Sequence, residues 1–141
     1  MKNKPLSIML IILVSITLVG AIAVVVIMKT ANDDPNKKPS IDDIIAMSVD
    51  IPEITTNLKD DQYVKLSLKA QTDSKDAKDE LEKRDFQVKN ILIEELSEMS
   101  AKDLDGKKGK EKLEEVIKSR TNALMQDGKV DKVYITSYII Q

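Results

Sequence analysis

The segment from Leu6 to Met28 constrains the chain most strongly, because it runs for 23 residues without a charged side chain and consists mainly of Ile, Leu and Val. As an α-helix it would rise about 1.5 Å per residue and reach about 35 Å, enough to cross the hydrocarbon core of a bilayer. We therefore predict a transmembrane helix over 6–28, preceded by a short amino-terminal segment over 1–5.

A cleaved signal peptide and a lipid anchor are the two alternatives to a permanent membrane helix. Lys2 and Lys4 supply the basic start of a signal peptide, and Ala21-Ile22-Ala23 resembles a cleavage site. The apolar run continues through 24–28, however, which makes it longer than a typical signal peptide. A lipid anchor would need a cysteine after Gly20, and the chain contains no cysteine. A retained membrane helix is the favoured interpretation.

The orientation of this helix does not follow from charge, because Lys2 and Lys4 on one side nearly balance Lys29, Lys37 and Lys38 on the other. The segment that follows the helix is long enough to be translocated largely regardless of its charge. An amino terminus inside the cell is therefore allowed, and we expect residues 1–5 in the cytoplasm.

Residues 29–47 differ in composition from both their neighbours. They contain two of the four prolines and are polar until Ile41, which predicts a tether between the membrane and a folded domain. Ile44 and Ile45, near its end, could already contact that domain. The domain itself is predicted over 48–141.

The charge pattern of 48–141 is that of an ordinary solvated surface. It holds 17 Lys or Arg against 20 Asp or Glu, with the two signs interspersed. Nucleic acid would require a concentrated basic face with stacking aromatic groups. Since the chain has only four aromatic residues, we predict no nucleic-acid partner. They are Tyr63, Phe86, Tyr134 and Tyr138.

Two strands are predicted at the start of the domain. Residues 48–58 have the β-branched content of a strand, but Pro52 removes a backbone donor and predicts an edge strand or a bulge. Residues 63–70 alternate between apolar and polar side chains, so this strand should have one buried and one solvated face.

A helical region follows, beginning at the candidate caps in 72–74. Apolar residues then recur at helical spacing as far as Met99, which predicts one long helix or two helices that meet near Phe86. Residues 100–103 fit a capping box for a short turn. Gly106 and Gly109 are expected to turn the chain into the next helix.

That next helix is predicted to extend to about Leu124, with Gly128 as its left-handed stop. Residues 130–141 are β-branched and aromatic and apolar on both faces, so we expect a strand inside the sheet. The order strand, strand, helix, helix, strand predicts an α+β domain with helices packed on one face of a small sheet.

The chain has no histidine and no cysteine, which removes several kinds of chemistry. Serine-histidine and cysteine-histidine catalysis, imidazole or thiolate zinc sites and thiol redox chemistry all require those residues. Carboxylate-only chemistry, a metal site made of carboxylates and carbonyls, a Ser-Lys pair, or no chemistry at all remain possible. Of these we predict the last, with no enzyme activity, no cofactor, no metal site and no small-molecule substrate.

The stretch GKKGKEKL, 106–113, resembles a phosphate-binding loop only superficially. That motif needs four residues between its glycines and a Ser or Thr after its lysine, whereas Gly106 and Gly109 are separated by two residues and Glu111 follows Lys110. We interpret the stretch as the entrance to a helix.

A calcium loop fits the same region no better. Asp103, Asp105 and Glu114 have the spacing of positions 1, 3 and 12 of an EF-hand loop, but Lys107 and Lys108 occupy the places of a carboxylate and the essential glycine. Paired carboxylates elsewhere are predicted to be solvated surface groups rather than acid-base catalysts. They are Asp33-Asp34, Asp42-Asp43, Asp60-Asp61, Glu94-Glu95 and Glu114-Glu115.

Several short motifs in this order resemble the flagellar basal-body-associated FliL family. The matching residues cover much of 48–141 and are Thr56-Asn57-Leu58, Tyr63-Val64-Lys65, Leu104, Gly106, Gly109-Lys110-Glu111-Lys112-Leu113, Asn122, Gly128-Lys129-Val130 and 133–141, VYITSYIIQ.

The resemblance implies a single-pass inner-membrane protein of the flagellar basal body, with a cytoplasmic amino terminus and an extracytoplasmic domain similar to stomatin and prohibitin domains. Such proteins form a ring beside the stator units, contact the linker of the stator's peptidoglycan-binding subunit and support torque under load. The short tether departs from longer family members. The motif matches assign no partner-binding residues.

Two other functions stay open at this point. One is a pilin-like or secretion-system subunit built around the apolar helix, although the glutamate expected early in such a helix is absent. The other is a membrane-anchored enzyme that uses carboxylates alone.

Overall fold

The computed structural model describes residues 4–30 and 38–141. The chain divides into two compact units, Met1–Lys38 and Pro39–Gln141, each with its own internal contacts. They are described one after the other.

The first unit contains one long helix, α1, over Lys4–Thr30. It includes the whole predicted span and extends two residues beyond it at each end. None of its apolar side chains is buried by protein, and its length and composition are those of a membrane span. The hydroxyls of Ser15 and Thr17 donate to the carbonyls of Ile11 and Leu13, each at 2.8 Å, so both are satisfied within the helix.

The second unit begins with a short helix, α2, over Ile41–Ala46, in the region predicted as tether. Ser40 and Asp43 form a capping box: the Ser40 hydroxyl accepts from the Asp43 amide at 3.1 Å, and the Asp43 carboxylate accepts from the Ser40 amide at 3.0 Å. Residues 41–46 of the predicted tether are thus helical, while 31–37 lie outside the described residues. Ile44 is partly buried, whereas Ile45 is exposed.

Three antiparallel strands form the sheet, in the order β1-β2-β3. They span Ser48–Asn57, Tyr63–Thr72 and Val130–Ile140. β1 lies at an edge and shifts register between Ile51 and Ile54, which confirms the edge strand with a bulge predicted from Pro52. β2 buries alternate side chains, as predicted, and runs in the centre of the sheet.

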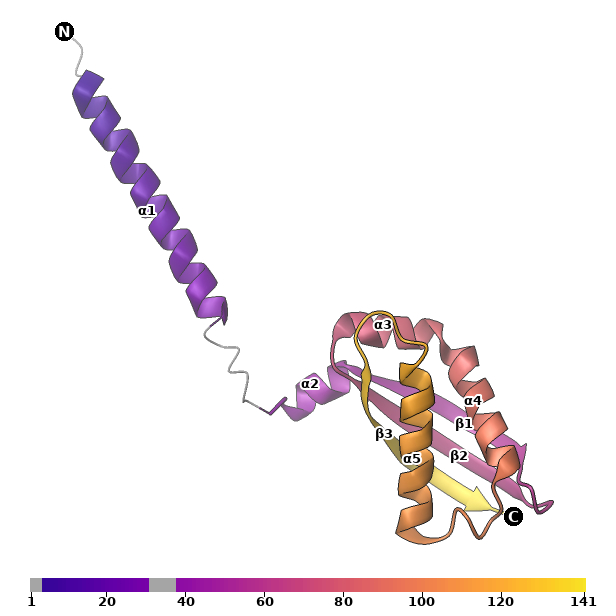
Figure 1. Cartoon of the computed structure of the whole chain (residues 1–141). Coiled ribbons are helices and arrows are strands. Elements are labelled where there is room, and N and C mark those ends of the chain that lie inside the picture. The colour runs from indigo at the N-terminus through magenta and orange to yellow at the C-terminus, as the bar shows by residue number, and fades with distance from the viewer. Residues whose placement is uncertain (1–3, 31–37) are drawn as a thin grey trace. The chain divides into compact units, whose positions relative to one another are not determined.

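β3 contradicts the expectation of an interior strand, because among the described residues it pairs only with β2 and forms the other edge (Figure 1). Its apolar content has a different cause. Val130 and Val133 are buried beneath the helices, and Ile135, Tyr138 and Ile140 are partly buried against the core.

The remaining helices cover one face of this sheet (Figure 1). They are α3 (Lys75–Lys83), α4 (Asp85–Glu98) and α5 (Gly106–Asn122). α3 and α4 confirm the alternative of two helices, with the break at Arg84, two residues before Phe86. The fold is α+β, as predicted.

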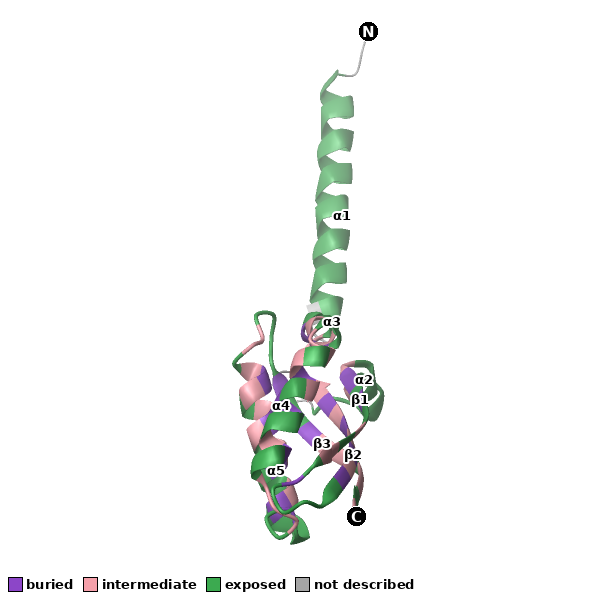
Figure 2. Cartoon of the chain, turned by 90° about the vertical axis from the view of Figure 1, so that its right-hand side faces the viewer, coloured by how far each residue is buried: buried purple, intermediate pink, exposed green. Residues whose placement is uncertain are grey.

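The core lies between the sheet and the helices, where β2 and the helices contribute most of the fully buried side chains (Figure 2). Among these are Leu66, Leu68, Leu81, Leu92, Leu96, Leu104, Leu113 and Ile117. Met99 and Met125, which fit a packing role, lie partly buried against this cluster.

Gly128 is left-handed, with φ +72°, but it does not stop α5, which ends at Asn122 with Ala123 as its cap. The glycine belongs instead to the turn that leads into β3. A Cβ on it would lie 2.9 Å from the Ala77 Cβ and 3.0 Å from the Ser74 hydroxyl, so the turn is pressed against the start of α3.

Candidate functional site

The two glycines of GKKGKEKL have different structural roles. Gly106 begins α5 with φ +68°, a conformation that glycine adopts without strain. Gly109 lies within the helix and is buried, and a Cβ there would overlap the Asp103 carbonyl oxygen and lie 2.8 Å from the Leu104 carbonyl carbon. The prediction that both glycines turn the chain is therefore correct for Gly106 and wrong for Gly109. Gly109 permits close packing of α5 on the preceding turn.

The residues with calcium-like spacing have separate structural roles. The Asp103 carboxylate accepts from the amide and hydroxyl of Ser100, each at 2.8 Å, which confirms the capping box and lowers the pKa of Asp103. Glu114 accepts from the Ile135 amide at 3.0 Å. Within 4–30 and 38–141, no three acidic side chains are grouped so that they could hold a metal ion.

The paired carboxylates are not all simple solvated groups. Asp60 accepts from the Ala101 amide at 3.0 Å and so joins the β1–β2 turn to the segment after α4. Glu94 and Glu95 on α4 bind Arg120 on α5, at 2.6 and 2.7 Å. These contacts connect elements that are distant in sequence. The pair Asp33-Asp34 lies outside the described residues.

The Arg120 contact joins two helices over a surface that is still open to solvent. Its guanidinium holds the pKa of Glu94 below the usual value, mainly through a direct hydrogen bond. The two carboxylates in turn raise the pKa of Arg120. An arginine side chain is charged throughout the physiological pH range, and this one bridges α4 to α5.

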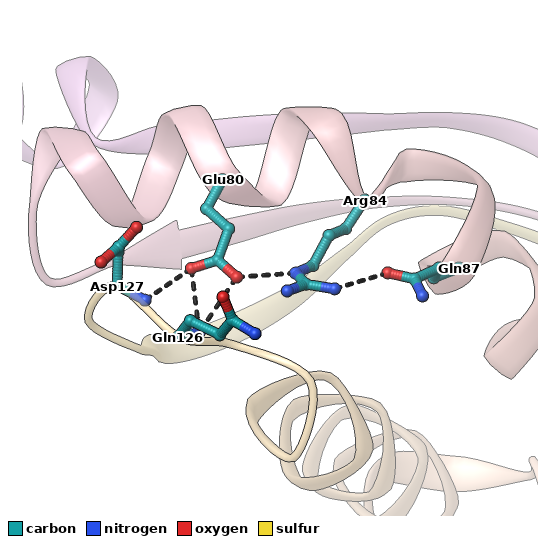
Figure 3. A network of polar contacts seen from close by, with 5 residues as sticks. All are labelled: Glu80, Arg84, Gln87, Gln126 and Asp127. Atoms are coloured by element: carbon teal, nitrogen blue, oxygen red, sulfur yellow. Dashed lines mark hydrogen bonds and ion pairs between the residues drawn. The ribbon is translucent and has the colours of Figure 1, made fainter.

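A second network connects α3 with the loop after α5 (Figure 3). The Glu80 carboxylate accepts from the amides of Gln126, at 3.0 Å, and Asp127, at 2.6 Å. It also binds Arg84 at 2.7 Å, and Arg84 donates to Gln87 at 2.8 Å. The Asp127 amide makes the largest contribution to lowering the pKa of Glu80. A single carboxylate thus organises a loop that has no regular structure.

The same loop is held on its other side by Asn122 and Asp73. The Asn122 side chain pairs with Val130 as a strand would, donating to its carbonyl at 2.9 Å and accepting from its amide at 2.7 Å. The Asp73 amide donates to the Lys129 carbonyl, and the Asp73 carboxylate accepts from the Lys129 amide, each at 3.1 Å. These contacts fix the start of β3.

Beside these networks lies a surface hollow of about 600 Å³ between α4 and α5, which we call the α4–α5 hollow. It is lined by Phe86, Gln87, Asn90, Ile91, Glu94, Arg120, Ala123 and Leu124. Phe86, the single phenylalanine of the chain, is 70% exposed at its rim, and Ile93, seven residues further along α4, is 46% exposed. Aromatic residues and arginine are both enriched at protein–protein interfaces.

Sequence reasoning did not identify Glu80, Asn122 and Phe86 as special positions. Asn122 belongs to the family motifs, but its pairing with Val130 is seen only in the folded structure, where the loop brings the two residues together. Phe86 marks the predicted boundary between the two helices. It does not share the helical spacing of the predicted apolar series, and this is the signal in the sequence that it faces solvent.

Comparisons with known proteins agree with the motif pattern. The family described as flagellar basal body-associated protein FliL matches residues 48–141. A flagellar protein FliL of Bacillus subtilis (strain 168) is 52% identical over 104 residues, which cover 74% of this chain and 74% of that protein. A flagellar protein FliL of Aquifex aeolicus (strain VF5) is 25% identical over 93 residues, covering 64% of this chain and 58% of that protein.

Proposed function

Because the chain belongs to the FliL family of flagellar basal-body-associated proteins, we propose that it is a non-enzymatic accessory protein of the flagellar motor that self-associates beside the stator units and supports them. Its place in the flagellum and in motility follows from the family. The contact with the stator, the self-association and the absence of catalysis are parts of the proposal.

We propose a single-pass topology with residues 1–5 in the cytoplasm, 6–28 in the cell membrane and 48–141 outside it. The support is an anchor helix with no buried residue, which needs a lipid environment, followed by a domain with a complete core of its own. Residues 29–47 would connect them, with α2 as their structured end. We also propose that the domain is related to stomatin and prohibitin domains.

The proposed mechanism is binding alone. A partner segment, which we take to be the linker of the stator's peptidoglycan-binding subunit, would be held in its force-bearing conformation because the domain binds that conformation more tightly than others. The observation that carries the proposal is the family match over 48–141, in a chain that also has a helix long and apolar enough to cross a membrane.

Deletion of the chain from its flagellated host tests this proposal. Swimming in viscous medium should decline more strongly than swimming in dilute medium, and the full chain supplied in trans should restore it. Unchanged swimming in both media would exclude a role in supporting the stator.

A further inference from the structure

The two edges of the sheet are built differently. The β1 edge carries Pro52, a bulge, and the acidic residues Asp50 and Glu53. Proline, bulges and charged side chains are the features by which natural edge strands avoid pairing with other chains. The β1 edge is therefore protected.

The β3 edge lacks most of these features. Its residues 133–141 contain no charge and no proline, and within the described parts of the chain no other strand pairs with its outer side. Gln141 exchanges two backbone hydrogen bonds with Tyr63, the first residue of β2, at 2.8 and 2.9 Å, so its backbone groups point towards β2. Since antiparallel ladders alternate, the backbone groups of Tyr138 and Ile140 point away from β2, towards the open side.

The register shift in β3 places one more backbone donor on the open side. Ile135 pairs with Leu68 after the shift. Its amide donates a hydrogen bond to the Glu114 carboxylate of α5, with 3.0 Å between nitrogen and oxygen, instead of to β2. Ile135 and Tyr138 thus both offer outward backbone groups, and both lie on the helix-covered face of the sheet, opposite Leu68 and Leu66.

The charges of α5 that accompany this edge have opposite signs. The Lys110 ammonium lies 4.4 Å from the centre of the Tyr138 ring, and Glu114 contacts Ile135. In an antiparallel alignment of two copies that sets Tyr138 against Ile135, each Lys110 is directed towards the Glu114 of the other copy. The edge is therefore complementary to itself in hydrogen bonding and charge.

We propose that β3 pairs in antiparallel fashion with β3 of a second copy of this chain, with Tyr138 opposite Ile135 of the second copy. The Ile135 amide then donates to the backbone of the second copy, and Glu114 turns from this amide to Lys110 of that copy. No like charges come to face each other between the strands, because 133–141 is uncharged.

This inference rests on the self-association in the proposed function and is independent of any contact with the stator. A twofold pairing closes on itself, so a ring requires a second, different contact between the resulting dimers. The β3 pairing supplies one of the two contacts.

Cysteine cross-linking tests the pairing directly, because the chain contains no cysteine of its own. Single cysteines are introduced at each position from 134 to 140 of the full chain in detergent micelles and oxidised. Paired strands bring opposite Cα atoms within about 4.5 to 5.5 Å, which suits a disulfide. Because Thr136 lies opposite Ser137 of the second copy in this register, cross-linking should be strongest in a mixture of Thr136→Cys and Ser137→Cys chains, and it should fall for cysteine positions further along the strand in either direction. Equal or absent cross-linking along the strand would overturn the proposal.

A charge exchange provides the second test, on a side chain that lies on the open face of the sheet. Ser137→Lys or Ser137→Glu alone should abolish the dimer measured by sedimentation of the full chain, because like charges then meet near the axis. A mixture of the two variants should restore it. Thr55→Lys, on the β1 edge, is the matched control and should leave the dimer intact.

The outcomes separate the two proposals. If the wild-type chain self-associates and Ser137→Lys does so equally well, the β3 pairing is wrong while the proposed function stands. If the wild-type chain is monomeric at every concentration, both the pairing and the self-association in the proposed function are contradicted.

Discussion

The helix α1 and the domain that follows it differ in what shields their apolar side chains from water. α1 has 27 residues and buries none of its apolar side chains, whereas the domain encloses a cluster of buried side chains between one sheet and three helices. The first unit depends on lipid as its solvent, and the second excludes water by its own packing. Substitutions of one chemical type should consequently have different effects in the two units.

The largest effect is expected from charges in α1. Leu13→Arg combined with Leu18→Arg should prevent stable membrane insertion, because each arginine near the centre of a span costs about 3 kcal/mol. Resistance to carbonate extraction measures the change. Ile93→Arg, at an exposed position of the domain, is the control and should remain in the membrane fraction. If the double variant still resisted carbonate extraction, α1 would not be the anchor.

Truncating a core side chain should have the next largest effect, and the loss of stability should occur in the domain only. Leu66 is fully buried on the central strand, so Leu66→Ala is expected to lower the free energy of unfolding by about 2–5 kcal/mol. The matched variant Leu13→Ala in α1 should leave the thermal unfolding midpoint of the domain unchanged. Equal shifts for the two variants would contradict the separation into two units.

The glycines sharpen the same comparison. Gly109→Ala forces a methyl group against the backbone of Asp103 and Leu104 and should destabilise the domain by about 1–3 kcal/mol. Gly20→Ala in α1, where nothing lies within 4 Å, should have no effect on thermal unfolding. A neutral Gly109→Ala would show that α5 does not need to approach the preceding turn so closely.

The smallest effect is expected for Glu80→Gln, and it should depend on pH. The folded pKa of Glu80 is lowered, so the carboxylate stabilises the domain fully above its unfolded value of about 4.3 and loses this contribution as the pH falls through the folded pKa. Unfolding midpoints measured from pH 7 to pH 3 should show wild type above the variant at neutral pH and the two converging in acid.

The control for this measurement is Glu82→Gln, on the same helix, whose carboxylate lies 3.7 Å from the Lys78 ammonium at the surface. It should shift the midpoint less than Glu80→Gln does. A constant difference between wild type and Glu80→Gln over the whole pH range would exclude the carboxylate charge as the cause.

Local patterns predicted the elements whose environment is determined by neighbours in sequence. The alternation in 63–70, the proline at position 52 and the capping box at Ser100 all led to the correct structure. The position of β3 at an edge could not be predicted in this way, because apolar content reports burial beneath helices as well as burial within a sheet. α2 was missed because six residues give too short a periodic signal, although its capping box was visible in Ser40 and Asp43.

The candidate site was less accessible to such reasoning. The contacts of Glu80 with Gln126 and Asp127 join residues 46 and 47 positions apart, and no spacing rule relates them. The hollow beside Phe86 likewise arises from the packing of α4 on α5. The family resemblance identified the protein class, and only the folded structure showed which surfaces the domain presents.

Motor torque under load tests the central claim most directly. The deletion host would be supplied with the full chain or with the Leu13→Arg, Leu18→Arg variant, and rotation of tethered cells would be recorded at high and low load. The account predicts that the full chain restores torque at high load and that the unanchored variant does not, with little difference at low load. Equal torque at high load with and without the chain would contradict it.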